Sequence, residues 1–160
     1  MKASKNARHR ARVLAVQALY QVDVTGIAPE QALATALHMT APESVEKPTD
    51  GATEQAPPSD VDLGYAESLV RTVCADRPRY DALITAASAN WRLDRIGRLD
   101  AQILRVGAAE LAHGMAPRPV VIDEAVEIAR EYCGDEARAF VNGVLDGIAR
   151  TLAASREATS

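Results

Sequence analysis

At 160 residues, with 48% apolar side chains and a net charge of −4, the sequence predicts one domain with a buried core and excludes a disordered or strongly basic protein. Aromatic residues make up only 4% of the chain and alanine is abundant, which favours closely packed helices over strands. Uncharged stretches such as residues 82–91 are much shorter than the ~18 residues of a membrane span, and the N-terminus lacks the apolar stretch of a signal peptide, so we expect a cytoplasmic protein.

The charge is unevenly distributed along the chain. Five basic residues precede the first acidic residue, Asp23, so the opening segment carries +5 and the remainder −9. This asymmetry predicts a local contact with a polyanion. The basic residues are Lys2, Lys5, Arg8, Arg10 and Arg12.

Helical periodicity predicts a first helix over residues 5–24. Arg8, Arg10 and Arg12 are expected to precede the part of this helix that packs on the core. Arg10, Gln17 and Gln21 fall on one line of its polar side, with Tyr20 beside them. Guanidinium, amide and phenol groups together can hold phosphates and contact unpaired bases. On composition alone, a solvated N-terminal helix explains the same pattern equally well.

Glycine and proline divide the middle of the chain. Gly26 ends the first helix, and Pro29 suits the first turn of the second. Residues 41–60 are rich in proline and acidic side chains and predict a flexible acidic loop. Ser59 or Asp60 can cap a third helix. Pro78 opens a fourth, over residues 79–90, and is followed by Trp91 and a weaker basic patch of Arg92, Arg95 and Arg98.

Residues 99–111 are apolar on every side of a helix, which predicts a central helix covered by its neighbours. Gly107 would allow another backbone to come close, and Gly114 can end the helix in a left-handed conformation. Arg105 is expected inside the fold, paired with a carboxylate. Asp100, in the first turn, is expected to reach an edge.

Two further helices complete the predicted all-α fold of about seven helices without a sheet. The sixth, over residues 120–133, stops at Gly134, and Asp135 caps the seventh, which we expect to fray after Ala153. Phe140 lies at the rim of the apolar stripe of the last helix. Its small-residue line predicts a tight helix–helix contact at Ala139, Gly143 and Gly147.

No pattern of catalytic or metal-binding residues stands out. The three histidines are scattered, and Cys74 and Cys133 are expected to be buried free thiols. Asp123 and Glu124 are adjacent carboxylates, but a solvated face shared with Glu127 and Glu131 explains them better than acid–base catalysis. We therefore expect neither an enzyme nor a cofactor.

Four segments in order resemble the NusB family of bacterial transcription antitermination proteins. They read ARHRARVLAVQALY (7–20), LDAQILRVGAAEL (99–111), VVIDEAVEIA (120–129) and FVNGVLD (140–146). The resemblance implies two packed three-helix units joined through the central helix. It also implies binding of boxA RNA with the ribosomal protein NusE, within an RNA polymerase antitermination complex, and some relatives form homodimers.

The resemblance also implies which residues bind. RNA contacts fall on Arg8, His9, Arg10, Arg12, Gln17, Tyr20, Arg138, Phe140 and Asn142, with His9 standing where relatives often have arginine. NusE contacts fall on Tyr20, Asp100, Glu136 and Phe140. Two rival interpretations remain open. The chain could be an RNA-binding module of a methyltransferase, although it has no room for a catalytic domain. It could also be a purely protein-binding adaptor, although the basic residues of its opening segment, the basic arm, argue against this.

Overall fold

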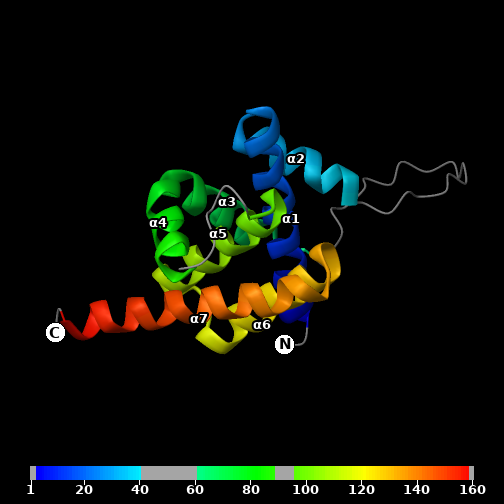
Figure 1. Ribbon diagram of the computed structural model, residues 1–160. Helices are drawn as coiled ribbons and strands as arrows, with labels where there is room; N and C mark the ends of the chain where they lie inside the picture. The colour runs from blue at the N-terminus through cyan, green and yellow to red at the C-terminus, as the bar shows by residue number, and fades with distance from the viewer. Residues whose placement is uncertain (1–2, 41–60, 89–95, 159–160) are drawn as a thin grey trace, which may run out of the picture.

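The computed structural model describes residues 3–40, 61–88 and 96–158, and within these ranges the chain forms seven α-helices and no strand (Figure 1). The predicted all-helical fold is confirmed. The helices are α1 (Ala3–Thr25), α2 (Pro29–Thr40), α3 (Leu63–Ala75), α4 (Arg77–Ala87), α5 (Arg98–His113), α6 (Arg118–Cys133) and α7 (Asp135–Ala158).

Helix α5 is the centre of the fold, as predicted. All of its residues from Ala101 to Leu111 are buried, because α1, α3, α4, α6 and α7 all pack against it. Helices α1, α2 and α3 contact one another, as do α5, α6 and α7, which gives the two expected three-helix units. Helix α4 completes the core by packing on α5 and α7 (Figure 1).

Glycines end the helices where the sequence predicted. Gly114 has a φ of 60°, and its N–H reaches the carbonyls of Glu110 and Leu111 at the end of α5. Gly26 and Gly134 also have positive φ values, after α1 and α6. The predicted cap of α3, Ser59 or Asp60, was wrong. Asp62 is the N-cap, and its carboxylate accepts a hydrogen bond from the Tyr65 N–H at 3.0 Å.

Some predicted features lie outside the described residues. These are the acidic loop over residues 41–60, with the expected caps Ser59 and Asp60, and the segment holding Trp91, Arg92 and Arg95. The expected fourth helix begins two residues earlier than predicted and ends at Ala87 rather than at residue 90.

Helix α7 is longer than predicted. It continues through Ala158 instead of fraying after Ala153, and its C-terminal end extends beyond the other helices (Figure 1). Arg156 Nη2 lies 3.4 Å from the carbonyl oxygens of both Leu111 and Ala112, at the end of α5. A cation is favourable there because helix carbonyls carry partial negative charge.

The small-residue line of α7 makes a close contact at only one position. A Cβ at Gly147 would lie 3.3 Å from the Ala87 Cβ of α4, whereas one at Gly143 would meet nothing within 4 Å, and Ala139 is exposed. The close neighbour of Gly107 is a side chain and not a backbone, since a Cβ there would lie 2.8 Å from Leu145 Cδ2.

The expected interior position of Arg105 is confirmed. Its Nε donates to Asp81 Oδ1 at 2.7 Å and its Nη2 to Oδ2 at 3.3 Å, so the guanidinium holds the carboxylate with two bonds. The cysteines are free, but the prediction that both are buried was wrong: Cys74 is exposed and Cys133 half-buried. None of the described helices has the length and apolar character that crossing a membrane requires.

Candidate nucleic-acid interface

The basic start of α1 is fixed against the first turn of α3. The N–H of Asp62 donates to the carbonyl of Ala7 at 3.1 Å, immediately before the arginines. Arg8 and Arg10 are exposed, as predicted for an arm that contacts a polyanion. Because the backbone is anchored next to them, these two guanidinium groups are presented from a defined position.

Arg12 does not belong to this exposed arm. Its side chain is only 4% exposed, and its Nε donates to Glu110 Oε1 at 2.7 Å. The expectation that Arg12 precedes the packed part of the helix was therefore wrong. Helical spacing explains the error, since Arg12 lies between the buried residues Ala11 and Leu14 on the side of α1 that faces α5.

Glu110 is the centre of a buried polar cluster that sequence reasoning missed. It is 1% exposed, and its Oε1 accepts both from Arg12 and from the Tyr65 hydroxyl, the latter at 2.8 Å. Burial raises the pKa of the Glu110 carboxyl, and the attraction and hydrogen bonds of Arg12 and Tyr65 only partly oppose this effect. The cluster joins α1, α3 and α5 through side chains.

The partners of Glu110 are perturbed as well. Burial is the largest influence on Arg12 and alone would lower its pKa, but the charge and hydrogen bond of Glu110, with Tyr65 and Glu124, raise the pKa overall. Burial, followed by the charge and hydrogen bond of Glu110, raises the pKa of Tyr65 to about 12. The phenol therefore stays protonated and can donate its hydrogen bond at neutral pH.

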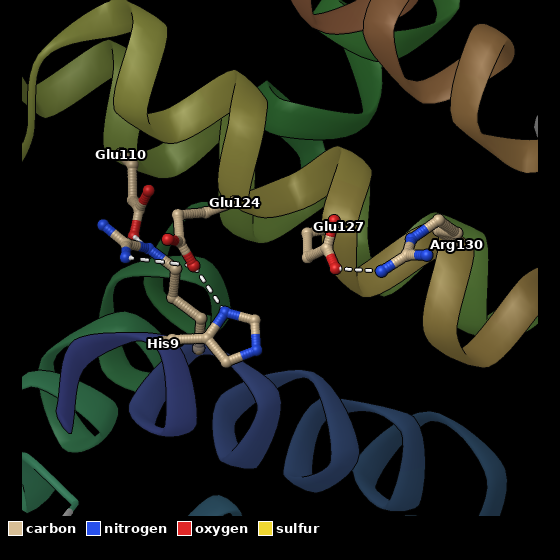
Figure 2. Close-up of polar contacts among 6 residues, drawn as sticks. His9, Glu110, Glu124, Glu127 and Arg130 are labelled. Atoms are coloured by element: carbon tan, nitrogen blue, oxygen red, sulfur yellow. Dashed lines mark hydrogen bonds and ion pairs between the residues drawn. The ribbon is translucent and has the colours of Figure 1, made fainter. Parts of the chain in front are cut away.

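His9 also contacts α6. Its Nδ1 lies 2.5 Å from Glu124 Oε2 (Figure 2). The same carboxylate oxygen is 3.9 Å from Arg12 Nη1. The predicted solvated face of α6 is thus wrong for Glu124, which is only 12% exposed in its side chain. Glu127 does lie on the exposed face, where it pairs with Arg130 one turn along (Figure 2).

The polar ridge of α1, formed by Arg10, Gln17, Tyr20 and Gln21, is less exposed than expected. Tyr20 is 39% exposed, but Gln17 and Gln21 are half-buried. Gln21 Nε2 lies 3.9 Å from Met39 Sδ, so it contacts α2. Tyr20 is therefore the side chain of this ridge that is most open to a ligand, together with Arg10 at its start.

The start of α7 presents the remaining predicted residues. Glu136, Arg138 and Asn142 are exposed, while Phe140 is half-buried and packs against the core, as expected for a residue at the rim. Arg138 Nη1 lies 4.0 Å from Asp135 Oδ1, an exposed pair of low strength.

Asp100 does not have the exposed position that we expected. It is half-buried, and its Oδ1 is buried without a hydrogen-bond partner in the described part of the chain. The residue lies beside Cys133, whose pKa is raised to about 12 by burial and then by the hydrogen bond and charge of Asp100. One oxygen of the Asp100 carboxylate is thus shielded from solvent.

The fold and this surface define a helical binding domain, in which a buried ion pair holds the basic start of α1. Among the residues that the structure describes, no group of His, Cys, Asp or Glu could hold a metal ion. The family model described as NusB family matches residues 9–150. The transcription antitermination protein NusB of Anaeromyxobacter dehalogenans (strain 2CP-1) is 40% identical over 149 residues, which cover 93% of this chain and 94% of that protein. The chain belongs to the NusB family of transcription antitermination proteins.

Solved structures of NusB proteins share the fold. T. maritima NusB is similar with a TM-score of 0.69 at 29% identity, over 89% of this chain and 90% of that one. A crystal structure of the antitermination factors NusB and NusE in complex with dsRNA gives a TM-score of 0.71 at 26% identity, over 94% of this chain and 98% of that one.

Proposed function

We propose that this protein binds boxA RNA of nascent ribosomal RNA transcripts together with NusE, and that the assembly joins an antitermination complex on RNA polymerase. The observation that carries the RNA half of the proposal is the pair of exposed arginines, Arg8 and Arg10, on an anchored helix start. The similar NusB fold solved with NusE and dsRNA supports both partners.

Within this surface we assign separate roles to the exposed side chains. Arg8 and Arg10 hold phosphates, because guanidinium groups match phosphate oxygens with two parallel hydrogen bonds. Tyr20 offers an aromatic face on which an unpaired base can stack. The remaining RNA contacts that we propose come from Gln17 on α1 and from Arg138, Phe140 and Asn142 on α7.

For NusE we propose a surface that includes Tyr20, Glu136 and Phe140. All three are exposed or half-buried, and two of them are aromatic, the residue type that most often anchors a protein interface. Asp100 has a smaller part in this proposal, because its carboxylate is partly buried within its own fold.

The proposal is tested by titrating a fluorescent boxA RNA, and a scrambled RNA of equal composition, with the protein alone and with added NusE. We expect boxA to bind more tightly than the scrambled RNA, and NusE to strengthen boxA binding by about 5- to 150-fold, the usual range of coupling between two ligands. Equal affinity for both RNAs with no effect of NusE would contradict the proposal. Binding of NusE without any RNA binding would identify a protein adaptor instead.

The oligomeric state should be measured in the same experiment. Sedimentation of the free protein and of its RNA complex distinguishes a monomer from a homodimer. If a dimer uses the RNA surface, added boxA RNA should dissociate it, whereas a dimer through another face should persist in the complex.

A further inference from the structure

We propose that Tyr65 is a positioning residue for RNA: its ring holds the guanidinium of Arg8 in place to meet a phosphate. This inference rests on the proposed RNA-binding function and adds a residue outside the four segments that carry the family resemblance. No sequence pattern pointed to Tyr65, which lies in α3, far along the chain from the basic start of α1.

Tyr65 is held at both ends. Its backbone N–H donates to Asp62 Oδ1 at 3.0 Å, within the cap of α3, and its hydroxyl donates to Glu110 Oε1 at 2.8 Å. Because Glu110 is buried and also bonded to Arg12, the hydroxyl is fixed to a rigid part of the core. The ring therefore cannot swing away from this position without breaking the hydrogen bond to Glu110.

Arg8 lies over this fixed ring. Its Cζ is 4.9 Å from the Tyr65 centroid, inside the ~6 Å range of a cation–π contact. The Cζ of Arg12 lies 5.4 Å from the same centroid. Arg12 is buried and bonded to Glu110, while Arg8 is exposed, so Arg8 is the member of this pair that an RNA can reach.

A guanidinium that stacks on an aromatic face keeps its N–H edge available for two parallel hydrogen bonds to phosphate. A free arginine would lose much of its side-chain freedom on binding RNA, and that loss weakens the complex. Tyr65 reduces this cost because it orders Arg8 before RNA arrives. The hydrogen bond from Asp62 N–H to the Ala7 carbonyl, at 3.1 Å, orders the adjoining backbone in the same way.

A double-mutant cycle in RNA affinity tests the coupling between the two residues. The variants are Tyr65→Leu, Arg8→Ala and both together, titrated with single-stranded boxA RNA at low salt. We expect Tyr65→Leu to weaken binding by about three- to tenfold when Arg8 is present, but by less than about twofold in the Arg8→Ala background, in keeping with the strength of cation–π contacts. Tyr65→Phe keeps the ring and should restore affinity to within about twofold of the original.

Two matched controls separate this coupling from general effects. Arg138 lies on α7 and pairs with Asp135, so Tyr65→Leu and Arg138→Ala should act additively. Tyr132→Leu removes an exposed tyrosine of α6 and should leave the affinity unchanged. Circular dichroism and thermal melts identify any variant that is not folded.

If Tyr65→Leu does not fold, Arg8→Lys decides the question, because lysine keeps the charge but lacks the planar group. A loss of about threefold or more with Arg8→Lys supports the proposal, and equal binding by Arg8→Lys overturns it. In the cycle itself, an equal effect of Tyr65→Leu in both Arg8 backgrounds also overturns it. If the unmodified protein binds no RNA at all, the proposed function fails, and that result is distinct from a binding protein without coupling.

Discussion

Arg12 of α1 and Glu110 of α5 lie 98 residues apart in sequence and form a buried ion pair, with Nε 2.7 Å from Oε1 and side-chain exposures of only 4% and 1%. Each charge has lost its hydration and depends on the other and on Tyr65. A buried pair of this kind need not add stability compared with apolar residues, but breaking it leaves one charge without a partner. The pair therefore fixes how the basic end of α1 sits on the central helix.

Replacement of Arg12 should consequently destabilise the fold. We expect Arg12→Ala to lower the free energy of unfolding by about 3 kcal/mol or more, because it strands the Glu110 carboxylate. Urea denaturation measures this loss. Arg118→Ala is the matched control: Arg118 pairs with Asp146 on the surface, so its loss should cost less than about 1 kcal/mol. Equal losses for the two variants would show that the Arg12 pair is not buried in solution.

The pH dependence of stability should reflect the raised pKa of Glu110. Burial raises that pKa above its ordinary value of 4.5, so the folded protein binds this proton more tightly than the unfolded chain does. Glu110 therefore contributes most stability below the unfolded pKa, and the contribution is lost as the pH rises through the folded pKa. Glu110→Gln has no such titration.

This dependence is measured as the difference in unfolding free energy between the original protein and Glu110→Gln, by urea denaturation between about pH 4 and 7. We expect the difference to favour the original protein most at the acidic end of this range, below the unfolded pKa of 4.5, and to shrink as the pH rises. A difference that grows with pH would mean that the attraction of Arg12 outweighs burial and lowers the pKa of the carboxyl.

The salt dependence of RNA binding should report the two exposed arginines of the arm. We expect the double variant Arg8→Ala/Arg10→Ala to weaken binding to every RNA and to reduce the slope of log affinity against log salt by about 1.4, or about 0.7 per phosphate contact on a single strand. The melting temperature should hardly change, since both side chains are exposed. Arg71→Ala/Arg79→Ala removes the same charge from exposed positions of α3 and α4 and should keep the original slope. An equal change of slope in the two double variants would show a general effect of charge and would contradict specific phosphate contacts by Arg8 and Arg10.

Much of the fold could be predicted because it depends on local signals. Apolar periodicity identified the helices, and Gly26, Gly114 and Gly134 end them with positive φ values. The central helix was predictable because a helix that is apolar on every side must be covered. Helix α7 was misjudged at its end, since local composition could not report the contact of Arg156 with the last carbonyls of α5.

The candidate site was harder to predict, because its contacts join distant segments. Arg12 has the same residue type as Arg8 and Arg10, and the carboxylate that pairs with it lies on another helix. Glu110 interrupts an apolar helix. A buried acid of this kind indicates that a cationic or hydrogen-bonding partner exists, but the local sequence does not identify that partner. Tyr65 carried no signal at all, since its contacts come from the packing of α3 on α1 and α5.

Arg105 and Asp100, on the same helix, should both be sensitive to replacement. Arg105→Ala strands Asp81, whose side chain is 26% exposed and can be partly hydrated, so we expect a loss of about 2–3 kcal/mol. Asp100→Lys places a cation where Oδ1 is buried, and should cost more than the ~1 kcal/mol expected from the helix dipole alone. Thermal melts of both variants check this. If Asp100→Lys is as stable as the original protein, Asp100 lies at the exposed edge that the sequence predicted.

Three helical glycines make a matched series, because the space around each differs. A Cβ at Gly143 would meet nothing within 4 Å, so Gly143→Ala should stabilise the fold by about 0.5–1 kcal/mol through better helix propensity. At Gly147 the new Cβ would lie 3.3 Å from that of Ala87, and this crowding should cancel most of the gain. At Gly107 it would lie 2.8 Å from Leu145 Cδ2 in the buried centre of α5, so Gly107→Ala should destabilise by about 1–3 kcal/mol. Urea denaturation should therefore rank the variants Gly143→Ala, Gly147→Ala and Gly107→Ala from most to least stable. A stabilising Gly107→Ala would contradict the close packing of α7 on α5, since the same propensity gain is available at all three positions and only the packing differs.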